Sequence, residues 1–306
     1  MTNFYDSQAI CEFTFSKLCP CWHLFTPENC PIIFTTIEDY KIGVSLFGIA
    51  ALICRNVKVI TFELMSNHIH ATICGTEESV REFFRLFRSL LYKYFKSKGG
   101  GSLPEQFDCS LRAIETLDDM RSVVVYNNRN GYLVHPEHSP YSYPYGANSY
   151  FFNPSAKDLY TCARTKFKMK DLEKLAHTHA VRDIQDQIYV VNGYISPLCF
   201  CDIETGEKLF RNAAHYFYCL SRNIESQKKI AGEIGDTVFY TDDELYSVAS
   251  AIAAKKYGLS LTQIPKEAKI EIAKTLHFDY NASNKALTRM LKLDISLINT
   301  LFPPRS

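Results

Sequence analysis

The stretch from residue 57 to residue 98 constrains the fold of this chain more than any other part of it. It begins with VKVITFELMSNHIHATICG (57–75), whose apolar and β-branched residues are typical of one strand or of a hairpin that ends at Gly75. It continues with EESVREFFRLFRSLLYKYFKSK (77–98), in which apolar residues recur at the spacing of an amphipathic helix. A sheet packed against helices, and hence an α+β domain, is the fold class that this succession predicts.

Other elements are predicted on the N-terminal side of this stretch. The segments AICEFTF (9–15) and CWHLFTP (21–27) have the composition of strands. IEDYKIGVSLFGIAALICR (37–55) has the pattern of a helix.

The segment ETLDDMRSVVVYNNRNG (115–131) is compatible with two structures. Asp118 or Asp119 is suited to cap a helix that Gly131 would end. Three consecutive valines also permit a strand, so local propensity leaves the choice open. The residues that follow, 131–156, are rich in Pro, Gly, Ser and Tyr and are predicted to form a loop.

The last part of the chain is predicted to be a small helical domain. In YTDDELYSVASAIAAKKYG (240–258), Thr241 and Glu244 have the spacing of a capping box. Two shorter helices follow, at 266–278 and 283–292, and a turn leads from the second into the segment 296–302. Two interpretations stay open, a helix-turn-helix that binds duplex or hairpin DNA and a plain packing bundle.

Two histidines, His68 and His70, are separated by one apolar residue within the strand-like run. Residues i and i+2 of a strand point to the same face, so the two imidazoles project together while Ile69 points to the other side. Two imidazoles on one face can chelate a metal ion if a third ligand comes from elsewhere. The alternative is a pair of histidines on a solvated face of the sheet.

Composition indicates an ordinary globular protein and excludes several classes. The 306 residues are 46% hydrophobic and 22% charged, with a net charge of +1, so any contact with nucleic acid must come from a local basic surface. The first residues lack the features of a signal peptide, and the run 43–54 is too short to span a bilayer. Eleven cysteines without zinc-ligand spacing predict free thiols in the cytoplasm.

The histidine pair lies in a segment that resembles the HUH-type DNA nucleases. ELMSNHIHATICG is similar to the LMPNHxHLLI segment of the REP-associated tyrosine transposases, which belong with the single-tyrosine transposases. CWHLFTPENCPIIFTTIEDY resembles the first strand of that family, VVVYNNRNG its Y-x-x-x-N-P helix, and HSPYSYPYGANSYFF its tyrosine-rich tail. The C-terminal segment resembles a helical appendage of some members. Ser66 and Gly131 stand where the family usually has proline.

The resemblance implies a ferredoxin-like HUH nuclease domain, an antiparallel sheet with helices, followed by a helical C-terminal domain. We expect the catalytic domain at 1–156, a mixed and mostly helical connecting region of unknown role at 157–235, and a helical, DNA-binding domain at 236–306.

The resemblance also selects one of the 19 tyrosines, Tyr126, as the nucleophile. If the segment is helical, Tyr126 and Asn130 are four residues apart and share one face. His68, His70 and Asn130 would then hold a divalent metal, Mg²⁺ or Mn²⁺, beside the phenol. The alternative is that Tyr126 packs on the sheet and Asn130 only caps the helix.

The activity implied by the resemblance is metal-dependent cleavage and strand transfer of single-stranded DNA, at hairpins or repeats. The Tyr126 oxygen would attack phosphorus, form a 5′-phosphotyrosine and release a 3′-OH. The expected partner is single-stranded or hairpin DNA and not a membrane, and the choice between a monomer and a homodimer stays open.

Basic residues at helical spacing predict where DNA would lie. A stripe on the helix at 77–98 lies apart from its apolar face and suits phosphate contacts, although a solvated charged face is the usual alternative. The residues expected to contact DNA are Arg81, Arg85, Arg88, Tyr92, Lys96, Arg129, Lys285, Arg289 and Lys292. The aromatic loop at 141–152 either stacks on unpaired bases or covers the core.

Two other functions compete with the transposase interpretation. One is a DNA-binding protein or repressor that keeps the fold but no longer cleaves. The other is a different HUH nuclease, a relaxase or a replication initiator, which commonly carries three histidines or paired tyrosines. A single H-x-H and a single tyrosine at the expected place disfavour the second of these.

Overall fold

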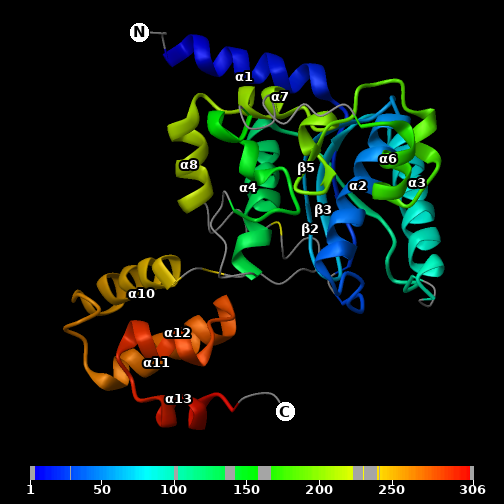
Figure 1. Ribbon diagram of the computed structural model, residues 1–306. Helices are drawn as coiled ribbons and strands as arrows, with labels where there is room; N and C mark the ends of the chain where they lie inside the picture. The colour runs from blue at the N-terminus through cyan, green and yellow to red at the C-terminus, as the bar shows by residue number, and fades with distance from the viewer. Residues whose placement is uncertain are drawn as a thin grey trace. The chain divides into compact units, whose positions relative to one another are not determined.

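The computed structural model describes residues 4–27, 29–99, 103–134, 142–157, 167–222, 230, 240 and 242–303 of the chain. It divides into two compact units, Met1–Asn223 and Ile224–Ser306, and the first is drawn from blue to yellow in Figure 1. Within the described ranges, every helix is too short or too polar to cross a bilayer.

The first unit is built on a four-stranded antiparallel sheet with the strand order β2-β3-β1-β4. Its elements follow one another as β1-α2-β2-β3-α3-β4, so the order and the direction of the strands are those of a ferredoxin-like fold. The prediction of an α+β, ferredoxin-like domain is confirmed. The elements are β1 (Cys21–Phe25), α2 (Ile37–Ile53), β2 (Lys58–Leu64), β3 (Ile69–Cys74), α3 (Glu77–Ser97) and β4 (Ser110–Ile114).

Helices α2 and α3 cover one face of the sheet with an aromatic core. Phe47 of α2 stacks on Phe62 of β2 at 4.6 Å between ring centroids, and it meets Phe83 and Phe87 of α3 edge-on. All four side chains are fully buried. Figure 1 shows these two helices on one side of the strands and α4 (Leu117–Val134) on the other.

The face of the sheet toward α4 is polar and buried. Five residues of this face have no exposed surface: His23, Thr61, Glu63, His70 and Thr72. Asn127 of α4 donates a hydrogen bond to Thr72 over 2.9 Å, and Asn128 accepts one from Thr61. Because buried polar groups are costly unless they are hydrogen-bonded, these matched contacts specify how α4 sits on the strands.

The segment 115–131, for which both a strand and a helix were possible, lies in helix α4. The ends of this helix differ from the prediction. Thr116, and not Asp118 or Asp119, accepts the capping hydrogen bond, which Asp119 donates from its backbone over 3.1 Å. The helix also continues for three residues beyond Gly131. Gly131 has a different role.

Gly131 lets the aromatic loop approach the helix. A Cβ at this position would lie 2.2 Å from Cδ1 of Tyr143, whose ring is buried against the helix. The Gly131 N–H donates to the carboxyl of Glu63 on β2. A proline at this position has no N–H and could not make this bond with the buried acid on the neighbouring strand.

We predict that Gly131→Ala destabilises the fold, although alanine favours helices. The added methyl overlaps the Tyr143 ring, and such overpacking costs about 1–3 kcal/mol. Urea unfolding measures the change, with Ser122→Ala on the same helix as the control that stays near the wild-type stability. A Gly131→Ala protein as stable as the wild type would show that Tyr143 does not pack there.

The N-terminal segment predicted as a strand at 9–15 is instead part of helix α1 (Phe4–Leu18). α1 packs on α4 and on α7 (Ile203–Lys208), and Arg121 of α4 donates to Gln8 over 3.2 Å. The contacts with these two helices override the strand propensity of the aromatic and β-branched residues.

The described part of the aromatic loop at 141–152 lies along the edge strand β2. Leu64 donates to the Tyr145 carbonyl over 2.9 Å, and Ala147 donates to the Phe62 carbonyl over 3.0 Å. Tyr143 is 1% exposed. Of the two interpretations of this loop, the packing one agrees with the structure, and the loop also shields an edge that would otherwise expose unpaired backbone groups.

Residues 167–222, which were expected to connect two domains, belong to the first unit. β6 packs on α2, α7 packs on β2, and α8 packs on α4. Their elements are α6 (Met169–Ala176), β5 (Val190–Val191), β6 (Tyr194–Ile195), α7 and α8 (Ala213–Arg222), with short 3₁₀ turns at Ala180–Asp183 and Pro197–Cys199. A further 3₁₀ turn, Asn148–Tyr150, precedes this region. The first unit therefore extends past residue 156.

The second unit is helical, as predicted. Its helices are α10 (Asp242–Tyr257), α11 (Lys266–Tyr280), α12 (Asn284–Leu291) and α13 (Ile295–Leu301), around one apolar core. Two tight turns begin with residues in the left-handed region, Asn281 before α12 and Lys292 before α13. Thr241 of the predicted capping box lies outside the described residues.

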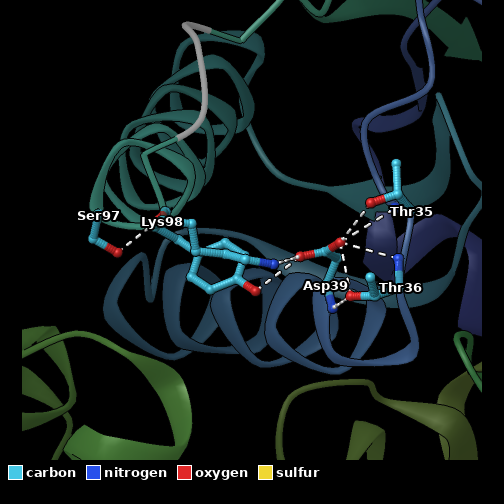
Figure 2. Close-up of polar contacts among 6 residues, drawn as sticks. Thr35, Thr36, Asp39, Ser97 and Lys98 are labelled. Carbon is cyan, nitrogen blue, oxygen red and sulfur yellow. Dashed lines mark hydrogen bonds and ion pairs between the residues drawn. The ribbon is translucent and has the colours of Figure 1, made fainter.

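A buried aspartate joins α2 to the end of α3. Asp39 is 1% exposed and completes a capping box with Thr36. It accepts hydrogen bonds from Tyr94 over 2.9 Å and from Lys98 over 2.7 Å, in addition to those from Thr35 and Thr36 that Figure 2 shows. Burial alone would raise the pKa of Asp39, but these donors outweigh it and hold the pKa far below its usual range.

Candidate functional site

The histidine pair lies at the tip of the β2–β3 hairpin. Met65 donates to the His68 carbonyl over 2.9 Å, which closes a two-residue turn at Ser66 and Asn67. The long apolar run is therefore a hairpin, and His68 immediately precedes β3. The ring centroids of His68 and His70 are 5.0 Å apart and nearly perpendicular, so the two imidazoles lie together as the spacing predicts.

Tyr126 reaches this group from α4. Its ring centroid lies 5.3 Å from that of His70 and 5.7 Å from that of His23, a residue of β1, and both contacts are edge-on. Nε2 of His23 lies 3.2 Å from Nδ1 of His70. Strands β1 and β3 and helix α4, which are far apart along the chain, thus place a phenol and two imidazoles side by side.

The orientation of the His68 ring follows from its neighbours. The Asn67 amide nitrogen donates to the Cys30 carbonyl over 2.9 Å, so its oxygen faces His68. Nδ1 of His68 lies 2.8 Å from that oxygen. An amide oxygen can only accept a hydrogen bond, and therefore Nδ1 of His68 carries a proton and, in the neutral ring, Nε2 carries the lone pair.

The predicted donor set suits a divalent cation. An unprotonated imidazole nitrogen is a common metal ligand, and the amide oxygen of Asn130 is a ligand that Mg²⁺ or Mn²⁺ accepts. Asn130 is half-buried and lies one helical turn after Tyr126. Among the described residues, no three His, Cys, Asp or Glu side chains are grouped to hold a metal, so a site here depends on the amide as third ligand.

The site is closed in this structure. Tyr126 is 2% exposed, His70 and His23 have no exposed surface, and His68 is 7% exposed. Glu63, opposite His70 on β2, is also fully buried. Burial raises the pKa of Glu63 well above its usual range, although the Gly131 N–H lowers it in part.

The basic residues predicted on the helix at 77–98 lie on the side of the sheet opposite Tyr126. Arg85, Arg88 and Tyr92 of α3 line a pocket of about 460 Å³, together with Ser89, Leu103 and Asp108. α3 packs against α2, and Figure 1 shows both helices on the side of the sheet opposite α4. DNA held by this stripe would therefore lie on the opposite face of the sheet from Tyr126.

The other basic residues have different surroundings. Arg81 forms an ion pair with Glu77 at 2.8 Å, and Lys96 lies 5.8 Å from the Tyr92 ring centroid. Arg129 is 1% exposed in α4, so the structure does not place it on a surface open to DNA. Lys285 and Arg289 lie on α12 of the second unit, and Lys292 ends that helix.

Sequence reasoning missed His23. The residue lies in the middle of CWHLF, which was predicted correctly as a strand, and a histidine inside an apolar strand is a signal of a buried polar contact. Its partner depends on the register, because the pairing of His23 with Thr72 brings it diagonally next to His70. The register of two distant strands cannot be read from either strand alone.

Comparisons with models of known protein families and with curated proteins find no match. Among solved structures, the chain is similar to one described as a REP-associated tyrosine transposase bound to a REP hairpin. The two share 14% sequence identity with a TM-score of 0.33, over 46% of this chain and 82% of that chain. A likeness at this level assigns no function to the chain.

Proposed function

We propose that the chain is a metal-dependent single-stranded DNA endonuclease and strand transferase of the HUH tyrosine type, with Tyr126 as nucleophile. The observation that carries the proposal is the convergence of Tyr126 on the histidine pair. Its ring lies 5.3 Å from that of His70, which in turn lies 5.0 Å from that of His68. A phenol can act as the nucleophile of covalent catalysis, and two imidazoles beside it can hold a metal ion that assists the reaction.

The reaction proceeds by exchange of one phosphoester for another. The Tyr126 oxygen bonds to phosphorus, the bond from phosphorus to the 3′-oxygen breaks, and the phenolic proton is balanced by the proton gained at the released 3′-OH. A second 3′-OH reverses the exchange and reseals a strand, so no external energy source is consumed.

His68, His70 and Asn130 are the residues that would hold the cation. When bound, Mg²⁺ or Mn²⁺ withdraws charge from a non-bridging phosphate oxygen and orients the phosphodiester. The sheet and α4 keep the two imidazoles and the phenol in fixed positions, because the contacts of Asn127 and Asn128 anchor the helix on the strands.

The burial of Tyr126 favours a second candidate, a DNA-binding protein that no longer cleaves. Because the Tyr126 residue is only 2% exposed, a phosphodiester can reach its phenol only if neighbouring groups move. In the second candidate Tyr126 packs on the sheet and the basic residues of α3 and α12 alone would hold DNA.

A covalent-adduct assay separates the two candidates. The full chain is incubated with a library of single-stranded hairpin oligonucleotides and Mn²⁺, and adducts are scored on a denaturing gel. The nuclease produces a protein–DNA band that requires Mn²⁺ and disappears in His68→Ala/His70→Ala. Binding to hairpins without any such band would support the second candidate.

A further inference from the structure

We propose that His23 is a positioning residue that fixes the tautomer of His70, so that Nε2 of His70 presents its lone pair to the cation. The inference rests on the proposed function, because it assigns a role in the metal site. It concerns a residue that the resemblance did not single out, and it can be tested without cleavage.

One ring nitrogen of His70 faces a second buried histidine. Nδ1 of His70 lies 3.2 Å from Nε2 of His23, within hydrogen-bond distance, and both rings are fully buried. One proton lies between these two nitrogens, on one ring or the other. If Nε2 of His23 donates it, His70 is protonated on Nε2 and cannot bind a metal, because a metal ligand must be unprotonated there.

For the proton between His23 and His70 we infer the position that gives His70 the same tautomer as His68. Asn67 accepts from Nδ1 of His68, and so Nε2 of His68 carries the lone pair. A hydrogen bond donated by Nδ1 of His70 to His23 makes the second imidazole present the same nitrogen as the first. Neighbouring groups that fix the tautomer and the orientation of ligating histidines in this way are a regular feature of metal sites.

His23 is not a third ligand in this arrangement. Its Nε2 points at Nδ1 of His70 and therefore at the ring nitrogen that does not face the cation. The grouping of His23, His68 and His70 is also not one that could hold a metal, within the part of the chain that the structure describes. Three histidines here thus do not reproduce a three-histidine centre.

The test is the tautomer of His70 in the metal-free protein. The chain is labelled with ¹⁵N-histidine, and correlations between ring nitrogens and ring carbon-bound protons report which nitrogen is protonated. Spectra of His70→Ala and His68→Ala assign the two residues among nine histidines. We expect both to be protonated on Nδ1. Protonation of His70 on Nε2 in the wild-type protein would overturn the proposal.

Two variants at His23 extend the test to metal binding. His23→Gln keeps an acceptor near the position of Nε2, whereas His23→Leu removes it. We expect His23→Leu to mix the tautomers of His70, to leave those of His68 unchanged and to lower Mn²⁺ affinity by about 10–100-fold, with His23→Gln close to the wild type. Equal Mn²⁺ affinity in His23→Leu and the wild type would contradict the proposal, whereas an Nδ1-protonated His70 without adducts would count against the proposed function alone.

Discussion

Replacing Tyr126 by phenylalanine is expected to abolish covalent adducts with single-stranded DNA while leaving the fold intact. The phenyl ring keeps the edge-on contacts with His23 and His70, so only the attacking oxygen is lost. Removal of a nucleophile leaves no route to the phosphotyrosine, so the adduct band should fall below detection. Denaturing gels measure the adduct, and thermal unfolding checks the fold.

Tyr216→Phe is the matched control for this substitution. The Tyr216 hydroxyl also contacts α4, where it accepts a hydrogen bond from Asn128 over 2.9 Å, and its ring packs among phenylalanines of the first unit. We expect this variant to form adducts at the wild-type level. Adducts that persist in Tyr126→Phe would show that another residue is the nucleophile.

Replacing Asp39 by alanine is expected to cause the largest loss of stability. The substitution leaves the Tyr94 hydroxyl and two backbone N–H groups without their acceptor and removes the capping box of α2. Losses of this kind in a buried network amount to about 3–5 kcal/mol. Urea unfolding measures the difference, and the exposed Glu204→Ala, which breaks only a surface pair with Lys208, should change stability by less than about 0.5 kcal/mol.

The effect of Asp39 should also depend on pH. Its pKa is held below the ordinary value by the donors around it, so the unfolded chain takes up the proton first as the pH falls. The stabilisation is fully present above the unfolded pKa and is lost as the pH falls toward the folded pKa. The gap in unfolding free energy between the wild type and Asp39→Ala should therefore narrow below about pH 5, and a gap that widens there would contradict this assignment.

Much of the first unit could be predicted from local patterns. The helix at 77–98 has strong periodicity and appears within a residue or two of its expected position. The run at 57–75 was compatible with one strand or a hairpin, and the structure shows the hairpin. The segment around Val123 stayed open because β-branched residues permit both structures. Its helical state is decided by contacts with the sheet, above all the hydrogen bond from Asn127 to Thr72.

The candidate site could also be predicted only in part, because it too depends on contacts between segments that are far apart in the sequence. The shared face of His68 and His70 follows from the period of a strand, and their closeness to Tyr126 agrees with the family resemblance. The contact with His23 depends on strand register, and the burial of the phenol depends on how α4 packs. Neither is encoded in a short segment.

The central claim is that Tyr126, and no other tyrosine, becomes covalently linked to DNA in a reaction that needs a divalent cation. The most direct measurement is mass spectrometry of the tryptic peptides from a trapped adduct. Cleavage after Arg121 and Arg129 releases residues 122–129, a peptide in which Tyr126 is the only tyrosine. We predict a nucleotide mass on this peptide with Mn²⁺ and none with a chelator, and a nucleotide on any other peptide, or on this one without metal, would contradict the claim.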